Sequence, residues 1–179
     1  MFLPLILTLT VFQSPAPADR FVTVNGLRIH YLEWGSADKP PLIMLHGIGR
    51  IAHTFDHIAP HFSANYHVMA VDMRGHGDSD WDPKGAYLVE DYVKDIEGLA
   101  RQLRLQNITI WGNSTGGRVA QVFAGLHPEM VSAVISEDVG PERPREIADG
   151  MYFAATLVLA AESGKSKRKI TGEVFDNVE

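Results

Sequence analysis

The sequence contains no cysteine, which excludes a disulfide, a thiolate nucleophile and a zinc site built on thiolates. Positive charge is also scarce: 16 Lys and Arg oppose 22 Asp and Glu, and a net charge of −6 argues against a nucleic-acid binder. No apolar run reaches the ~20 residues of a transmembrane helix, so we expect no stable membrane span. The sequence as a whole is 45% hydrophobic and 21% charged, a balance that is typical of one globular domain of 179 residues.

The most apolar stretch is the beginning of the chain, MFLPLILTLTVF, and it is followed by Ala16-Pro17-Ala18. This arrangement resembles a secretory signal, although no Lys or Arg precedes the apolar run. A mis-set start codon that adds a non-native leader is the alternative. We therefore assign residues 1–18 to a leader or signal-like segment. The protein is expected to be secreted or periplasmic if this is a signal peptide, and cytoplasmic otherwise.

Residues 19–145 alternate between predicted strands and helices. Asn25-Gly26, between two alternating runs, is the strongest short signal for a β-hairpin. Continuous apolar runs predict strands buried on both faces, and apolar residues at helical spacing predict helices. The predicted strands after the hairpin are 40–47, 66–77, 107–112 and 131–139, and the predicted helices are 53–63 (weak), 87–103 and 116–130. This order predicts the α/β class, with a mostly parallel, twisted sheet and flanking helices. Residues 146–179 are assigned to the start of a cap region or a loose tail.

One serine stands between glycines where a predicted strand gives way to a predicted helix, in Gly112-Asn113-Ser114-Thr115-Gly116. This is the G-x-S-x-G pattern of a nucleophile elbow. Small flanking residues let a tight turn close, and the helix directs its free N–H groups and positive dipole end to the same place. A plain turn with a serine helix cap is the structural alternative. A phosphate loop would need a lysine after the glycines, and none is there.

Four stretches together resemble the α/β-hydrolase family of the serine-nucleophile type: LHGIG (45–49), DMRGHGDSD (72–80), GNSTGG (112–117) and VISEDVGPE (134–142). The resemblance covers about residues 20–145, which correspond to the first six of the eight strands in that fold. It implies that Ser114 is the nucleophile and that the backbone N–H groups of Thr115 and Ile48 are the two oxyanion donors. It also implies that His46-Gly47 shape a loop of the binding site. It also implies that Arg74 and Asp78 fix the loop after the fourth strand.

The resemblance narrows the expected chemistry without identifying a substrate. Family members that open epoxides or remove halide carry Asp at the elbow, whereas Ser114 implies attack on a small acyl substrate such as an ester or lactone. No cofactor and no metal are implied. GNS followed by GG also resembles enzymes that hydrolyse C–C bonds in ring-cleavage products, which is the alternative activity.

The rest of a catalytic triad is harder to find. The family order is serine, then acid, then histidine, and the one histidine after Ser114 is His127, at the end of the predicted helix that points away from the site. Glu137 or Asp138 could serve as the acid in a known family variant, but the same residues resemble the turn into a cap. We therefore expect an incomplete hydrolase chain without its catalytic histidine, with a non-catalytic binding protein of the same fold as the rival. The sixth strand is then an open edge that favours self-association.

Three other patterns are discounted. His53, His57 and His61 lie at helical spacing, but Pro60 interrupts the helix, so we expect surface histidines rather than a metal site. The series Asp78, Asp80 and Asp82 lacks the glycine and glutamate that a calcium loop requires at its sixth and twelfth positions. Glycosylation sequons begin at Asn107 and Asn113, and both asparagines are expected to be inaccessible.

Overall fold

The computed structural model describes residues 16–139, so most of the leader and the predicted cap or tail lie outside the described residues. Six strands are present: β1 (Ala18–Val24), β2 (Leu27–Trp34), β3 (Pro41–Leu45), β4 (His67–Val71), β5 (Ile108–Asn113) and β6 (Val131–Glu137). The helices are the 3-10 helix η1 (Ala52–Phe55) and the α-helices α1 (Ala59–Phe62), α2 (Val89–Gln102) and α3 (Thr115–Leu126).

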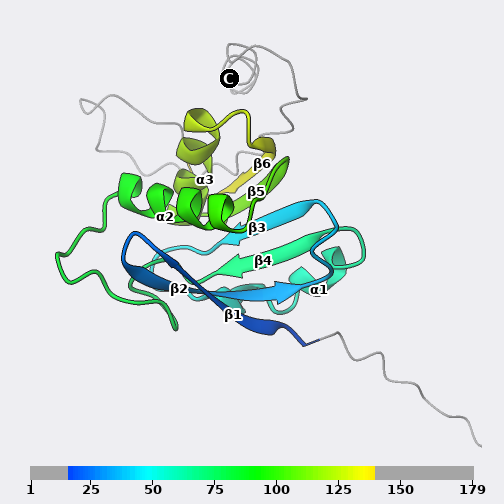
Figure 1. Cartoon of the computed structure of the whole chain (residues 1–179), viewed down its shortest axis with the longest axis horizontal. Coiled ribbons are helices and arrows are strands. Elements are labelled where there is room, and N and C mark those ends of the chain that lie inside the picture. The colour runs from blue at the N-terminus through cyan, green and yellow to red at the C-terminus, as the bar shows by residue number, and fades with distance from the viewer. Residues whose placement is uncertain (1–15, 140–179) are drawn as a thin grey trace, which may run out of the picture.

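The strands form one sheet in the order β1-β2-β4-β3-β5-β6. Strands β4, β3, β5 and β6 run parallel, and the β1–β2 hairpin adds antiparallel to the edge of β4. Helices α2 and α3 cover one face of this sheet, whereas η1 and α1 lie on the other (Figure 1). The α/β class and the mostly parallel sheet are therefore confirmed.

The hydrophobic core is divided by the sheet into two clusters. The larger one lies under α2 and α3 and includes Ile43, Ile96 and Phe123, and the smaller one lies under η1 and α1 and includes Trp34 and Phe55. Every residue of β3 and of β4 is buried, as expected for strands covered on both faces. These two central strands therefore form the rigid base from which the loops of the site extend.

The hairpin turn is confirmed at Asn25-Gly26, where both residues have positive φ (52° and 80°), as a type I′ turn requires. Strand β1 begins at Ala18, which pairs with Glu33, three residues before the alternating pattern begins at Phe21. The hairpin is thus longer than the sequence pattern predicts, because backbone pairing continues where the alternation of side chains does not.

The helix predicted over 87–103 is α2, Val89–Gln102, and the other two predicted helices differ more from the structure. The segment 53–63 is divided into η1 and α1, with Pro60 in the first turn of α1, where its missing N–H is tolerated. Helix α3 ends at Leu126 rather than 130, since His127 has non-helical angles and Pro128 follows it. The first predicted helix is therefore divided into two short helices near Pro60, and α3 ends at His127-Pro128, before its apolar pattern does.

The long loop between β4 and α2 is fixed by a buried ion pair. Arg74 donates to both carboxylate oxygens of Asp95 on α2 and to the carbonyl of Ala86. Asn25 of the hairpin turn also donates to Asp95. The expected role of Arg74 in holding this loop agrees with these contacts. Asp78 contributes differently, because its side chain is exposed and its backbone N–H donates to Asp72.

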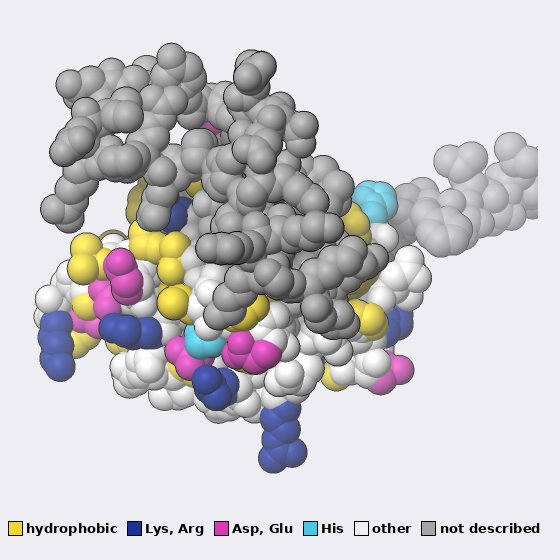
Figure 2. All heavy atoms as spheres, turned by 90° about the horizontal axis from the view of Figure 1, so that it is seen from above, with side chains coloured by type: hydrophobic (Ala, Val, Ile, Leu, Met, Phe, Trp, Pro, Cys, Tyr) yellow, Lys and Arg dark blue, Asp and Glu magenta, His cyan; other side chains and the backbone are white. Residues whose placement is uncertain are grey.

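The surface carries both signs of charge, and the face in Figure 2 shows Lys, Arg, Asp and Glu side chains interspersed. Within residues 16–139, no helix is long and apolar enough to cross a bilayer. In the same range β6 pairs only with β5, so it lies at the edge of the described sheet. Self-association through this edge stays a prediction.

Candidate functional site

Ser114 joins β5 to α3 in a backbone conformation that L-residues rarely adopt, with φ 51° and ψ −116°. Its N–H donates to the carbonyl of Glu137 on β6 (2.8 Å), and its carbonyl accepts from Arg118 in the first turn of α3 (3.0 Å). Its half-buried side-chain hydroxyl has no hydrogen-bond partner among the described residues. The surrounding backbone therefore holds a strained serine whose hydroxyl is available.

The glycines around Ser114 are needed because backbone segments pass very close to them. A Cβ on Gly116 would collide with the carbonyl oxygens of Leu45 and His46 at the end of β3. A Cβ on Gly112 would collide with the backbone of Gly116 itself. The absent side chains thus let the beginning of α3 approach β3 and let the turn close.

The loop that follows β3 lies directly against this turn. A Cβ on Gly47 would be 3.2 Å from the Cβ of Ser114 and 3.2 Å from Oδ1 of Asn113. His46 is fully buried: its Nδ1 donates to the Gly47 carbonyl (2.8 Å), and its Nε2 accepts from the N–H of Met73 (3.1 Å). Burial lowers the pKa of His46, although the Gly47 carbonyl acts in the opposite direction. His46 is therefore a neutral structural bridge.

Two backbone N–H groups near the serine have no partner within residues 16–139. They belong to Ile48, in the loop after β3, and to Thr115, the first residue of α3. The side chain of Ile48 is 64% exposed, so the loop presents an apolar residue beside these donors. Unpaired N–H groups beside a free hydroxyl, at the positive end of a helix, are an arrangement that stabilises a developing oxyanion.

The structure does not bring an acid–base partner to Ser114 from the described part of the chain. No imidazole within residues 16–139 hydrogen-bonds to the Ser114 hydroxyl. His127 lies at the opposite end of the twelve-residue helix α3, ~18 Å along its axis, and contacts Glu97 (3.6 Å) and Glu129 (3.7 Å) instead. Asp138 follows β6 with φ 57° and an exposed side chain.

Sequence reasoning missed a buried network around Asp72, the first residue after β4. His30 of β2 contacts Asp72 through Nδ1 (2.8 Å) and Asp19 through Nε2 (3.2 Å). Polar atoms of His30, Asp72 and Asp78 lie within 4.8 Å of one another, but Asp72 already accepts the backbone N–H groups of Ala52 and Asp78. The network is therefore structural. Because His30 and Asp72 are 42 residues apart, no local spacing could have indicated it.

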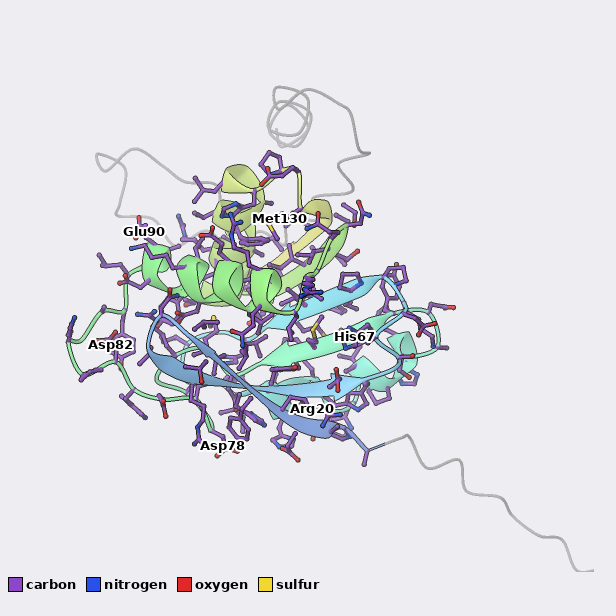
Figure 3. All side chains as sticks on the ribbon, in the orientation of Figure 1. Arg20, His67, Asp78, Asp82, Glu90 and Met130 are labelled. Carbon is purple, nitrogen blue, oxygen red and sulfur yellow. The ribbon has the colours of Figure 1, made fainter. Side chains whose placement is uncertain are left out.

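The structure also places the residues of the patterns that were discounted as metal, calcium or glycosylation sites. His53, His57 and His61 are exposed. Asp78 and Asp82 lie on separate parts of the loop between β4 and α2 (Figure 3). One expectation is wrong: Asn107 is exposed, because it stands in a turn with φ 54° before β5 begins.

Comparison with known proteins gives three kinds of match. A family model described as alpha/beta hydrolase fold matches residues 40–162. Among curated relatives, a serine hydrolase-like protein of Danio rerio is 34% identical over 117 residues, and a 3-hydroxybutyrate-oligomer hydrolase of Cupriavidus necator is 35% identical over 118. These matches cover 65% and 64% of this chain but only 36% and 40% of the relatives. Epoxide hydrolase A from Mycobacterium thermoresistibile superposes with a TM-score of 0.68 at 32% identity, covering 73% of this chain and 41% of that one.

Proposed function

The chain belongs to the α/β hydrolase fold family, and from this premise we propose that Ser114 is the nucleophile of a hydrolase that cleaves small acyl substrates such as carboxylic esters or lactones. The observation that carries the proposal is the conformation of Ser114. A strained, left-handed serine with an unbonded hydroxyl stands at the beginning of a helix. Strain of this kind persists only where the surrounding structure enforces it, and it concentrates at functional sites.

Ser114 and the two backbone N–H groups would supply two parts of acyl transfer, the nucleophile and the donors to the oxyanion. In the first step the Ser114 oxygen bonds to the carbonyl carbon, and the carbonyl π electrons move to the oxygen, which becomes an oxyanion. The N–H groups of Ile48 and Thr115 would then donate to this oxyanion. The carbonyl then re-forms as the C–O bond to the leaving group breaks, and the leaving alkoxide takes up the proton that the serine lost. Water afterwards attacks the acyl-serine, which releases the carboxylic acid and restores the serine hydroxyl. The serine proton must pass to a base, which is absent from the contacts of Ser114 within residues 16–139.

The choice of acyl chemistry over epoxide opening depends on the residue at position 114. Proteins named as epoxide hydrolases are among both the structural and the curated matches, and a serine hydrolase-like protein is also among the curated ones. Opening an epoxide through a covalent intermediate uses a carboxylate nucleophile, whose ester water can later cleave. A serine in its place would leave an ether, which is far harder to hydrolyse. Ser114 therefore favours substrates with an electrophilic carbonyl.

Intact-protein mass spectrometry after treatment with a fluorophosphonate tests the proposal. We expect one adduct, located on Ser114 by peptide mapping and abolished in Ser114→Ala. Ser36→Ala, which removes an exposed serine in the loop between β2 and β3, should label like the wild type. Without a neighbouring base, labelling should be slow and accelerate about tenfold for each unit of pH, since hydroxide must remove the proton.

The rival is a non-catalytic binding protein that retains the fold. It predicts no adduct on Ser114 at any pH, in a chain shown to be folded by cooperative unfolding. An adduct that persists in Ser114→Ala would also contradict the proposal. A labelling rate that reaches a plateau near neutral pH would support the nucleophile and reveal a base outside the described residues.

A further inference from the structure

Two imidazoles join the loop after β3 to the loop after β4, and they do so in opposite directions. His46 extends from the first loop and accepts the N–H of Met73 on the second (3.1 Å). His76 extends from the second loop and accepts the N–H of Gly49 on the first (3.2 Å). The centroids of the two rings are 5.0 Å apart. The β3 loop is therefore clamped on both sides of Ile48.

The two hydrogen bonds of His76 assign the roles of its ring nitrogens. Its Nδ1 lies 3.0 Å from the carbonyl oxygen of Arg74, and a carbonyl can only accept, so Nδ1 carries the proton. Nε2 then holds a lone pair, which is what the N–H of Gly49 requires as its acceptor. His76 therefore bridges the backbone of its own loop and that of the β3 loop, with Nδ1 as donor and Nε2 as acceptor.

The clamp controls the two peptide units on either side of Ile48. The carbonyl of Gly47, in the first unit, accepts from Nδ1 of His46 and from the N–H of Arg50 (3.1 Å). The N–H of Gly49, in the second unit, donates to His76. The Ile48 N–H shares a planar peptide unit with the Gly47 carbonyl and points the opposite way. Since the Ile48 side chain is 64% exposed, packing does little to hold this segment.

We propose that His76 is a positioning residue that holds the Ile48 N–H in place for the oxyanion of the substrate. This inference rests on the proposed function, because it needs Ile48 to act as an oxyanion donor. His76 touches neither Ser114 nor any reacting atom. It acts by holding Gly49, and through the shared backbone it limits how far the loop can swing away from the elbow.

Three variants separate hydrogen bonding from packing. His76→Phe keeps a ring beside His46 but removes both nitrogens, and His76→Gln restores an acceptor at about the reach of Nε2. His57→Phe, at an exposed histidine between η1 and α1, is the matched control. Amide hydrogen exchange measured by NMR should rise about 5- to 10-fold at Gly49 in His76→Phe. The fluorophosphonate labelling rate of Ser114 should fall about 10-fold. His76→Gln should recover part of both, and His57→Phe should change neither.

The two readouts distinguish the failure of this inference from the failure of the proposed function. If the wild type is not labelled on Ser114, the proposed function fails, and with it the assigned role of His76, whatever Gly49 does. If the wild type is labelled and His76→Phe changes neither exchange nor labelling, the clamp itself is overturned. If exchange at Gly49 rises while the labelling rate stays the same, His76 holds the loop but does not position the donor, and the inference is wrong.

Discussion

The guanidinium of Arg74 and the carboxylate of Asp95 form two parallel hydrogen bonds, Nε to Oδ2 and Nη2 to Oδ1, each 2.6 Å long. Both side chains are 4% exposed. The pair links the loop after β4 to the middle of α2, and Asn25 attaches the hairpin turn to the same carboxylate. One ion pair therefore holds three segments that are distant in the sequence.

We predict that Arg74→Met lowers the free energy of unfolding by about 3–5 kcal/mol, because it leaves the Asp95 carboxylate buried without its partner. Arg101→Met, which removes an exposed pair with Glu97 on the surface of α2, should cost about 0.5 kcal/mol or less. Urea denaturation measures both. A loss below about 1 kcal/mol in Arg74→Met would show that water reaches Asp95 and that the pair is not buried in solution.

A second prediction compares two glycines of α3. Gly116→Ala should destabilise the fold by about 1–3 kcal/mol, because the new methyl group meets the carbonyl oxygens of Leu45 and His46. Gly125→Ala should instead stabilise it by about 0.5–1 kcal/mol, since nothing lies within 4 Å and alanine favours the helix. Thermal melts of the two variants give the comparison. Equal effects would mean that α3 does not approach β3 as closely as described.

The architecture could be predicted from the sequence because the apolar pattern of each element agrees with its burial in the fold. The apolar runs of β3 and β4 specify strands buried on both faces, and Asn25-Gly26 specifies the hairpin. The tight turn from β5 into α3 was also predictable, since G-x-S-x-G is a local pattern between a strand and a helix. These features need no knowledge of distant contacts.

The contacts that hold the site in shape could not be predicted in the same way. His30 with Asp72, Arg74 with Asp95 and His76 with Gly49 join segments whose separation in the sequence follows no rule of spacing. Histidine also has several ordinary roles, so its presence in RGHG says nothing about which nitrogen accepts a backbone N–H. The partner of each polar side chain becomes visible only when the sheet brings the loops together.

A third prediction concerns pH. Burial lowers the pKa of His46 in the folded state, so below its ordinary value of about 6.5 the unfolded chain takes up a proton that the folded chain refuses. The stability contributed by neutral His46 is therefore complete above pH ~6.5 and declines as pH falls, by up to about 1.4 kcal/mol per pH unit. Urea denaturation between about pH 7.5 and 5.5 measures the slope, and NMR titration of the His46 ring identifies the group.

The pKa of another histidine, His53, is shifted in the opposite direction, so this residue serves as the control for the pH dependence of stability. The hydrogen bond to Asp56 raises the pKa of exposed His53, so its smaller contribution is present at low pH and lost as pH rises. His53→Gln should therefore leave the decline toward acid pH in place or make it slightly steeper. If the His46 ring titrates at or above its ordinary pKa, neutral His46 is not what bridges the two loops.

The last prediction concerns the strain at Ser114. With φ 51° and ψ −116°, any residue with a Cβ is strained there, at a cost of about 1–3 kcal/mol, whereas glycine adopts this region freely. Ser114→Gly should therefore be more stable than Ser114→Ala by about 1 kcal/mol or more, although both remove the hydroxyl and both should resist the fluorophosphonate. At exposed Ser36, where φ is not positive, the glycine variant should be no more stable than the alanine variant. Urea denaturation of the glycine and alanine variants at each position measures these differences in the free energy of unfolding. If glycine and alanine are equally stable at 114, the turn between β5 and α3 relaxes in solution, and the strain cannot be what presents the proposed nucleophile.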